Sequence, residues 1–569
     1  MTGHTAIPLA QVRGALKARS TPKGRQIDLT ARAEIAALLA ASPFGAPRRD
    51  LLIEYLHQIQ DKFHAISAAH IAALAEALKL AQTEVYEVAT FYHHFDVLRE
   101  GEAAPAALTV RVCETLSCAM AGGEELLAKL PGILGKGVRV VAAPCLGRCS
   151  EAPAVCVGQN EVGYASIEKI TKAVETKAGR ALPANHLGYK AYQDAGGYKL
   201  YADVVSGKRD IESTIKEMEH SGLRGLGGAG FPTGRKWRIV RGEAAPRIMA
   251  VNIDEGEPGT FKDRHYLERD PHRFLEGMLI AAHIVGTSAC YVYLRDEYHQ
   301  CRALLEAEIA ALKKNPPAGH PLPLIELRRG AGAYICGEES AMIESIEGKR
   351  GMPRLRPPYV AQVGVFGRPT LEHNFETLYW VRDILDKGAA WFAGHGRHDR
   401  KGLRSFSVSG RVKKPGVHLA PAGITVTELI DEYCGGMVDG HTLYAYLPGG
   451  ASGGILPASM GNIPLDFDTL QPYGCFIGSA AVVVLSQHDK ARDAALNLMK
   501  FFADESCGQC TPCRVGTEKA VQLLAESKWK TGLLEELSQA MVDASICGLG
   551  QAAPNPIRCV IKHFAHEIA

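Results

Sequence analysis

The stretch "RGLGGAGFPTGRKW", residues 224–237, contains five glycines in ten positions and two cations near its end. Three of the glycines satisfy the G-x-G-x-x-G pattern of dinucleotide-binding folds, namely Gly225, Gly227 and Gly230. The surroundings differ from that fingerprint, because segment 211–220 has apolar residues at helical spacing instead of a strand, and Pro232 and Gly234 oppose a long helix directly after the loop. The stretch therefore predicts backbone that approaches a phosphate or a flat ring closely, with a flexible surface loop as the alternative.

Two further elements combine an apolar run with acidic residues. Residues 248–263, "IMAVNIDEGEPGTFKD", predict a strand that ends in an acidic turn, and residues 332–340, "GAYICGEES", repeat that arrangement. Ligands of α/β sheets lie at the carboxyl ends of the strands, so both turns are candidate ligand contacts. A solvated turn is the alternative for each of them.

Cysteines at 113, 118, 145 and 149 form C-x4-C and C-x3-C pairs, each directly after a strand-like run. Zinc ribbons usually use C-x2-C pairs, whereas wider loops suit the two irons of a [2Fe–2S] cluster. The spacing therefore favours iron–sulfur over zinc. The predicted ligands are Cys113, Cys118, Cys145 and Cys149, and Cys156, in an apolar strand, is expected to be a core thiol.

A second group of cysteines lies in "ESCGQCTPCR", residues 505–514. The C-x2-C-x2-C spacing of Cys507, Cys510 and Cys513 suits three corners of a [4Fe–4S] cluster. A helical run follows, so the fourth ligand must come from further along the chain. Cys547 is predicted, because glycines flank it and let backbone approach a bulky cluster; Cys559, in an apolar helical context, is the alternative ligand. Buried thiols without metal are the other interpretation of this group.

The composition limits the class of protein. The chain has 569 residues, 46% apolar and 22% charged, which predicts several globular domains. Lys plus Arg total 64 against 62 for Asp plus Glu, so no net field indicates nucleic acid or a membrane surface. No apolar run reaches the roughly 18–20 residues of a membrane span. No secretory segment is visible, so a reducing cytosol is expected, and the fifteen cysteines then favour metal binding over disulfides.

These motifs, in this order and over nearly the whole chain, resemble the NADH-oxidising flavoprotein of respiratory complex I, preceded in the same chain by its small thioredoxin-like [2Fe–2S] partner. The resemblance rests on "EVATFYHHF", the first cysteine group, the glycine loop, "NIDEGEPGTFKDR", "GAYICGEESAMIESIEGKRGMPRLRPPYV", "HNFET" and "ESCGQCTPCR". The fused arrangement looks most like the β subunit of soluble NAD-dependent formate dehydrogenases that contain molybdenum or tungsten.

The resemblance implies a set of cofactor contacts. Those implied for FMN are Arg224, Gly225, Gly227, Gly228, Ala229, Gly230, Lys236, Asn252, Asp254, Glu255, Tyr334, Gly337, Glu338, Asn374 and Thr377. Those implied for NAD are Phe231, Glu257, Glu339, Arg356 and Tyr359. The family commonly has Lys and Phe where this chain has Arg356 and Tyr359, and an aromatic residue near the position of Ile239 is absent, so the adenine end departs most from the family.

The resemblance also implies a multidomain α/β architecture. It comprises an N-terminal helical bundle, a thioredoxin-like [2Fe–2S] domain, a Rossmann-like domain for FMN and NADH, a small β-grasp domain and a C-terminal helical bundle with the [4Fe–4S] cluster. The expected bounds are 1–105 for the helical region, 106–182 for the [2Fe–2S] domain, 183–205 for a linker, 206–400 for the FMN and NAD(H) domain, 401–487 for the β-grasp domain and 488–569 for the [4Fe–4S] domain.

The function implied is that of a diaphorase subunit in the cytoplasm, which exchanges hydride between NAD(H) and FMN and single electrons between FMN and its clusters. No side-chain acid or base is required for hydride transfer. The implied partner is a formate-oxidising subunit with a molybdenum or tungsten pterin site and further iron–sulfur clusters, and no nucleic acid or membrane insertion is expected. A diaphorase subunit of a NAD-reducing hydrogenase or of complex I is the nearest alternative. A zinc-stabilised scaffold without redox chemistry is the alternative from another class.

Overall fold

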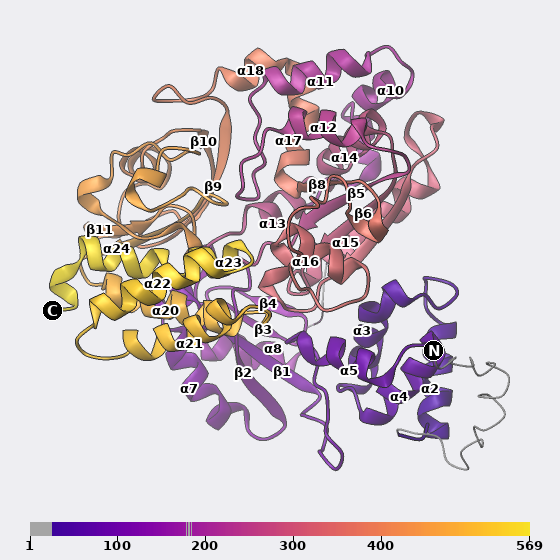
Figure 1. Cartoon of the computed structure of the whole chain (residues 1–569), viewed down its shortest axis with the longest axis horizontal. Coiled ribbons are helices and arrows are strands. Elements are labelled where there is room, and N and C mark those ends of the chain that lie inside the picture. The colour runs from indigo at the N-terminus through magenta and orange to yellow at the C-terminus, as the bar shows by residue number, and fades with distance from the viewer. Residues whose placement is uncertain (1–24, 178, 180–181, 184) are drawn as a thin grey trace, which may run out of the picture.

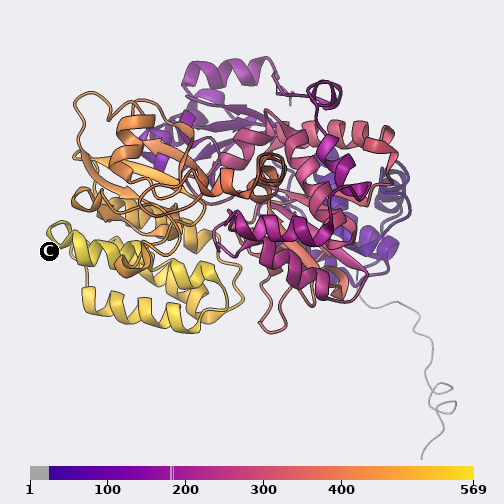
Figure 2. The same ribbon diagram turned by 90° about the horizontal axis from the view of Figure 1, so that it is seen from above.

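The computed structural model describes residues 25–569 except residues 178, 180, 181 and 184. The first 24 residues of the predicted helical region therefore lie outside the described residues. In both views the N-terminal and C-terminal helices lie at opposite ends of the molecule (Figure 1, Figure 2). None of the described helices is long and apolar enough to cross a membrane.

Helices make up the N-terminal unit, as predicted. They are α2 (Leu29–Ala40), α3 (Leu52–Phe63), α4 (Ala68–Leu78) and α5 (Gln82–Phe91). Side chains cap α2 and α4, because Asp28 accepts from the backbone N–H of Ala31 and Ser67 from that of His70. The unit is tied to the large α/β region, since Arg328 Nη2 donates to Asp50 Oδ2 at 2.6 Å.

A four-stranded sheet with the order β2-β1-β3-β4 forms the small α/β domain. Its elements are β1 (Leu108–Cys113), β2 (Val138–Ala143), β3 (Val155–Val157), β4 (Asn160–Val162), α6 (Leu116–Met120), α7 (Gly123–Leu134) and α8 (Ile167–Glu175). Strands β1 and β2 are parallel, so the loops that follow them leave the same edge of the sheet. This brings the two cysteine pairs of the sequence together.

The predicted linker 183–205 contains two short helices, α9 (Tyr189–Asp194) and α10 (Lys199–Val205). Their buried tyrosines surround His272 at the start of α14 (Pro271–Val285), and the hydroxyl of Tyr198 lies 2.8 Å from His272 Nδ1. The segment lacks helical periodicity because its aromatic residues are spaced by glycines, yet it packs firmly on the larger domain.

A four-stranded parallel sheet with the order β7-β6-β5-β8 is the centre of the large α/β domain. Its elements include β5 (Arg247–Ile253), β6 (Thr287–Leu294), β7 (Leu324–Arg329), β8 (Thr370–Asn374), α11 (Ile211–His220), α15 (His299–Lys314), α16 (Glu339–Ile346) and α17 (Phe375–Lys387). The carboxyl ends of β5 and β8 are adjacent, since Asn252 pairs with Asn374. The acidic turn and the start of α17 therefore face the same crevice.

One helix differs from the sequence-based expectation. The helix α12 (Thr233–Gly242) begins directly after the glycine loop, where Pro232 and Gly234 predicted no long helix. Pro232 is the residue just before the first turn, where a missing N–H costs nothing. Gly234 lies against Glu219 of α11, so a side chain at this position would clash with backbone. The glycine serves close helix packing.

A five-stranded mixed sheet with the order β10-β9-β13-β11-β12 follows. Its strands are β9 (Leu403–Gly410), β10 (Gly416–Pro421), β11 (Leu443–Leu447), β12 (Leu456–Pro457) and β13 (Ala481–Ser486). The chain then ends in helices, namely α20 (Ala491–Asp504), α21 (Thr511–Leu524), α22 (Thr531–Ala544), α23 (Gly548–Ala552) and α24 (Asn555–His563). In Figure 1 these yellow helices cover the lower side of the orange β-rich domain.

The interface of the N-terminal unit predicts an acid-sensitive fold. Burial lowers the pKa of His299 to about 3, while Asp296 partly opposes that shift. The unfolded chain binds a proton there below about pH 6.5, but the folded chain does not, so stability falls by about 1 kcal/mol for each pH unit below 6.5. In His299→Gln we expect a smaller drop in melting temperature between pH 7.5 and 5.5 than in the unaltered protein. His395→Gln, at an exposed site, is the control, and an unchanged drop in His299→Gln contradicts the prediction.

Candidate functional site

The glycine loop folds back on itself beside the start of α17. The N–H of Gly225 donates to Phe231 O at 2.8 Å, and the N–H of Leu226 donates to Thr377 Oγ1 at 2.9 Å. A Cβ on Gly227 would lie 3.0 Å from the Cβ of Asn374. The bare backbone at this point therefore approaches the N-terminus of α17, where N–H groups and the helix dipole favour a phosphate.

Arg224 holds this loop from its outer side. Its Nε donates to Gly230 O at 2.5 Å, its Nη1 pairs with Asp468 at 2.5 Å, and its guanidinium lies 4.5 Å from the centre of the Phe467 ring. The structure thus directs Arg224 toward the β-rich domain. Its contribution to a cofactor site is the support of the loop.

The carboxyl end of β5 carries an unpaired acceptor. Asn252 Nδ2 donates to Gly337 O at 2.9 Å, which joins the two acidic turns. Asp254 Oδ2 is buried and has no hydrogen-bond partner among the described residues, and burial raises the pKa of this carboxyl well above its usual value. A buried acceptor without a donor is costly. A ring N–H of a flavin is a donor of the kind that this oxygen requires, so the site fits FMN.

Glu255, in contrast, is fully engaged inside the protein. Its two carboxylate oxygens accept from the N–H groups of Asp263 and Arg264 at 2.8 and 3.1 Å. The hydroxyl of Tyr298 donates to it at 2.8 Å, and burial raises the pKa of Glu255 to about 7. Glu255 therefore orders the acidic turn, and its side chain has little capacity left for a cofactor.

Lys236, Asn374 and Thr377 line the same crevice from α12 and α17. Lys236 Nζ donates to the carbonyl and the carboxylate of Glu372 at 3.0 and 3.1 Å. Asn374 Nδ2 donates to Asp263 Oδ2 at 2.7 Å, and its Oδ1 caps α17. Their polar atoms converge where the glycine loop approaches the sheet.

Glu257 and Tyr334 lie on the other side of the crevice. The hydroxyl of Tyr334 donates to Glu257, which also accepts from the N–H and hydroxyl of Ser452 at 2.8 and 2.6 Å. Burial raises the pKa of Glu257. Ser452, in the Gly-rich stretch of the β-rich domain, was not predicted as a site residue, because its role depends on a contact between domains.

The remaining residues implied for the nucleotide are more open. Phe231 and Tyr359 are exposed, at 38% and 55%, and Arg356 Nη2 pairs with Glu339 at 3.0 Å. Glu338 also pairs with Arg356, but one of its oxygens caps α16 by accepting from Ser340 and Ala341. The structure brings these residues to the rim of the crevice.

The cysteines of the C-terminal unit line one small cavity. Its lining contains Cys507, Cys510, Cys513 and Cys547. Burial raises the pKa of Cys513 to about 11 and that of Cys547 to about 12, so these thiols keep their protons until a metal displaces them. Cys559 lies elsewhere, with its Sγ 3.5 Å from that of Cys475. The geometry fits a [4Fe–4S] cluster held by the four lining cysteines.

The other four cysteines are all buried at the edge of the small α/β domain. The Sγ atoms of Cys145 and Cys149 are 3.3 Å apart, and the Cys113 thiol interacts with those of Cys118 and Cys145. Four thiols in mutual contact fit a binuclear cluster. Arg295, which was not predicted, donates to Cys145 O at 2.7 Å and to Glu255 O at 2.6 Å.

Cys156 offers a test of this assignment. Its Sγ points to Gly158 O at 3.3 Å, away from the four thiols. We expect Cys156→Ala to keep the [2Fe–2S] signal in the electron paramagnetic resonance (EPR) spectrum of the reduced protein, whereas Cys149→Ala loses it. The measurement is EPR together with iron content. Loss of the signal in both variants contradicts the assignment.

Comparison with known proteins identifies each of these units. Four families match: thioredoxin-like [2Fe-2S] ferredoxin over residues 35–178, Nuo51 FMN-binding domain over 218–383, SLBB domain over 405–456, and the NADH-ubiquinone oxidoreductase-F iron-sulfur binding region over 493–569. These matches confirm the predicted multidomain α/β fold and the predicted FMN, [2Fe–2S] and [4Fe–4S] groups. Which side chains contact each group stays a prediction.

Relatives match over long stretches. An NADH-quinone oxidoreductase F-type chain of Rhizobium meliloti (strain 1021) is 40% identical over 399 residues, 68% of this chain and 94% of the relative. NADH dehydrogenase [ubiquinone] flavoprotein 1, mitochondrial, of Dictyostelium discoideum is 42% identical over 65% of this chain and 80% of its own length. A crystal structure of an NAD+-reducing [NiFe]-hydrogenase in the H2-reduced state aligns over 91% of both chains, with a TM-score of 0.78 and 32% identity. Together with the order of its domains, these similarities show that the chain belongs to the F-type family of NADH-quinone oxidoreductase chains, the NADH-binding flavoproteins.

Proposed function

We propose that the chain passes electrons between NAD(H) and a formate-oxidising partner that carries a molybdenum or tungsten centre, and that it works in the cytoplasm in the direction of NAD+ reduction. Family membership supports the coarser part, an NADH-binding flavoprotein with two kinds of iron–sulfur cluster. FMN, when bound, converts between the electron pair of a hydride and the single electrons that clusters carry.

The observation that carries the electron-exchange role is the short helix η4 (Tyr334–Gly337). The hydroxyl of Tyr334 donates to Glu257, and its N–H donates to Glu505, two residues before Cys507, at 2.8 Å. The next residue, Ile335, lines the cavity of the C-terminal cysteines. One turn of backbone therefore borders both the crevice beside β5 and the four-cysteine cavity, which supports direct exchange between a flavin and a [4Fe–4S] cluster.

The residues of the crevice have separate roles in this proposal. The glycine loop with Lys236, Asn252, Asp254, Tyr334, Gly337, Asn374 and Thr377 holds FMN, while Arg224, Glu255 and Glu338 fix the loops around it. The nucleotide lies over the open side, against Phe231, Glu257, Glu339, Arg356 and Tyr359. Support for this orientation comes from the exposed rings of Phe231 and Tyr359 at the rim and from the buried carboxylate of Glu257 below them.

The partner is proposed from the resemblance of the fused arrangement to formate dehydrogenase β subunits. A hydrogenase partner is the second candidate, and the 32% identity to a chain of an NAD+-reducing [NiFe]-hydrogenase over 91% of the length favours it. The motifs of this chain serve either partner, because the substrate of the partner is oxidised elsewhere.

Purification of the chain alone and with its co-purifying subunits tests the proposal. The chain alone is expected to be brown, to bleach with NADH, to release FMN on denaturation and to reduce dyes with NADH but not with formate. Molybdenum or tungsten in the purified complex supports a formate-oxidising partner, and nickel instead supports the hydrogenase. Formate oxidation by the chain alone contradicts the division of labour, and a colourless protein with zinc contradicts the redox role.

Glu257→Gln tests the nucleotide side. A hydrogen bond to a charged group contributes roughly 1 kcal/mol more than a neutral one, so we expect the KM for NADH to rise about tenfold while FMN content stays unchanged. Glu518→Gln, on the exposed face of α21, is the control. Steady-state NADH:ferricyanide kinetics measure the effect, and an unchanged KM argues against a contact of Glu257 with the nucleotide.

A further inference from the structure

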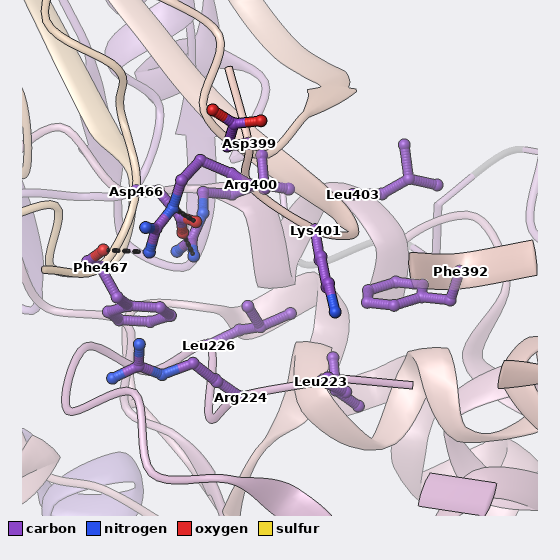
Figure 3. Close-up of a pocket in the computed structure, with 13 residues that line it drawn as sticks. Leu223, Arg224, Leu226, Phe392, Asp399, Arg400, Lys401, Leu403, Asp466 and Phe467 are labelled. Carbon is purple, nitrogen blue, oxygen red and sulfur yellow. Dashed lines mark hydrogen bonds and ion pairs between the residues drawn. The ribbon is translucent and has the colours of Figure 1, made fainter. Parts of the chain in front are cut away.

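A cavity of about 250 Å³ lies between the outer side of the glycine loop and the β-rich domain (Figure 3). Its walls come from residues 222–226, from Phe392 of α18 (Ala389–Ala393), from the segment 399–404 that leads into β9, and from Asp466 and Phe467. The volume lies just below the range of drug-sized pockets, so its ligand is a small metabolite.

The charges of this cavity do not cancel. Four cationic side chains line it against two acidic ones, an excess of two positive charges: Arg224, Arg400, Lys401 and Arg404 face Asp399 and Asp466. Arg400 and Arg404 share the single carboxylate of Asp466, at 2.9 and 2.6 Å. Asp468 at the rim offsets Arg224. One net positive charge remains.

Two of the cations have donors without partners. Arg404 is only 4% exposed, and its Nε has no hydrogen-bond partner among the described residues. Lys401 forms no hydrogen bond or ion pair within the described part of the chain. Burial also lowers the pKa of Arg404, a sign that the surroundings hold its charge at a cost. A buried donor without an acceptor destabilises the fold unless a ligand supplies one.

The opposite wall of the cavity is apolar. In Figure 3 the side chain of Lys401 extends between Phe392 and Leu226 toward Leu223. The ring of Phe467 has the guanidiniums of Arg224 and Arg404 at 4.5 and 4.2 Å from its centre. A ligand that fits both walls therefore combines a negative group with a short apolar body.

We propose that this cavity binds a small organic anion, with a carboxylate or phosphate group facing Lys401 and Arg404 and an apolar body against Leu223 and Phe392. Binding has a mechanical consequence, because Arg224 reaches from the cavity wall to Gly230 O. An anion that orders Arg224 also steadies the glycine loop. The ligand thereby acts as an effector that slows the release of FMN.

This cavity is separate from the crevice beside β5. Of the residues implied for FMN, only Arg224 also lines it. Gly227 meets Asn374 in the crevice, whereas a Cβ on Gly230 would lie 2.6 Å from the ring of Phe467 in the cavity wall. The loop thus separates the two spaces, and the inference does not depend on which partner the chain has.

Binding of three probes to the FMN-loaded full chain tests the proposal: inorganic phosphate, phenyl phosphate and butyrate, each titrated by calorimetry against chloride at equal ionic strength. We expect saturable binding of at least one probe that carries an apolar body, tighter than that of inorganic phosphate. Lys401→Gln is expected to weaken it about tenfold, because a charge-assisted hydrogen bond is lost. Lys414→Gln, an exposed lysine elsewhere in the β-rich domain, leaves binding unchanged.

The outcomes separate the two sources of negative charge. Tight binding of phenyl phosphate alone indicates a phosphate ester, and tight binding of butyrate alone indicates a carboxylate. With the bound probe, FMN fluorescence after dilution is expected to rise more slowly. Binding that appears only in FMN-free protein, or that Lys401→Gln does not weaken, overturns the proposal, as does the absence of saturable binding of all three probes.

Discussion

Cys547→Ala is expected to abolish the [4Fe–4S] signal in the EPR spectrum of the NADH-reduced protein, while Cys559→Ala keeps it. Cys547 lines the cavity with the three cysteines of the C-x2-C-x2-C run, 34 residues after the last of them. Its removal leaves a cluster with three protein ligands, and iron content is expected to fall by about four atoms per chain. Iron analysis and low-temperature EPR measure both effects.

Cys559 is the matched control for this substitution. It is buried like its alternative, but its thiol contacts Cys475 between the β-rich domain and α24. Its loss leaves a small space in the core at a cost of about 1 kcal/mol, without loss of iron. A spectrum that changes in Cys559→Ala and not in Cys547→Ala would reverse the assignment of the fourth ligand.

Gly230→Ala is expected to lose most of the bound FMN. Gly230 has φ +66°, and an added Cβ would lie 2.6 Å from the ring of Phe467. The left-handed backbone costs roughly 1–2 kcal/mol for a side chain, and the clash must move the loop away from Phe467 in addition. Because Arg224 bonds the carbonyl of this same residue, the movement disrupts the brace of the loop. We expect FMN affinity to fall at least tenfold, measured by flavin content and fluorescence titration.

Gly222→Ala separates strain from collision. Gly222 has a similar φ of +73°, but a Cβ there meets nothing within 4 Å. It shares the backbone cost and lacks the clash, so melting temperature falls slightly while flavin content is retained. Equal loss of FMN in both variants argues that the loop does not position the cofactor.

The sequence was sufficient for the kind of each domain and for the two cysteine groups. Ligand spacing is a local property, and the glycines around Cys547 pointed to the residue that the structure places with the other three. The helix before the glycine loop was also predicted from its periodicity and is α11. The helix after it was missed, because Pro232 precedes the first turn and Gly234 is required by packing against α11.

Roles that depend on contacts between distant segments were not predictable. Glu255, Glu338 and Arg224 carry charges beside candidate ligand sites, yet their hydrogen bonds are directed at backbone N–H groups, a helix end and a neighbouring domain. Ser452 reaches Glu257 from nearly two hundred residues away. Neither composition nor spacing distinguishes a side chain that binds a cofactor from one that shapes the loop beside it.

Arg295 has a consequence for how electrons move. Its buried guanidinium joins the carbonyl of Cys145 to that of Glu255, and Asn497 Nδ2 donates to Glu114 O at 2.9 Å on the other side of the small α/β domain. The thiol-bearing edge is thus attached to two neighbouring domains through main-chain atoms. A carrier that swings between donor and acceptor is incompatible with this attachment. Electrons that reach this cluster therefore tunnel across a fixed separation, and their rate depends on driving force and not on domain motion.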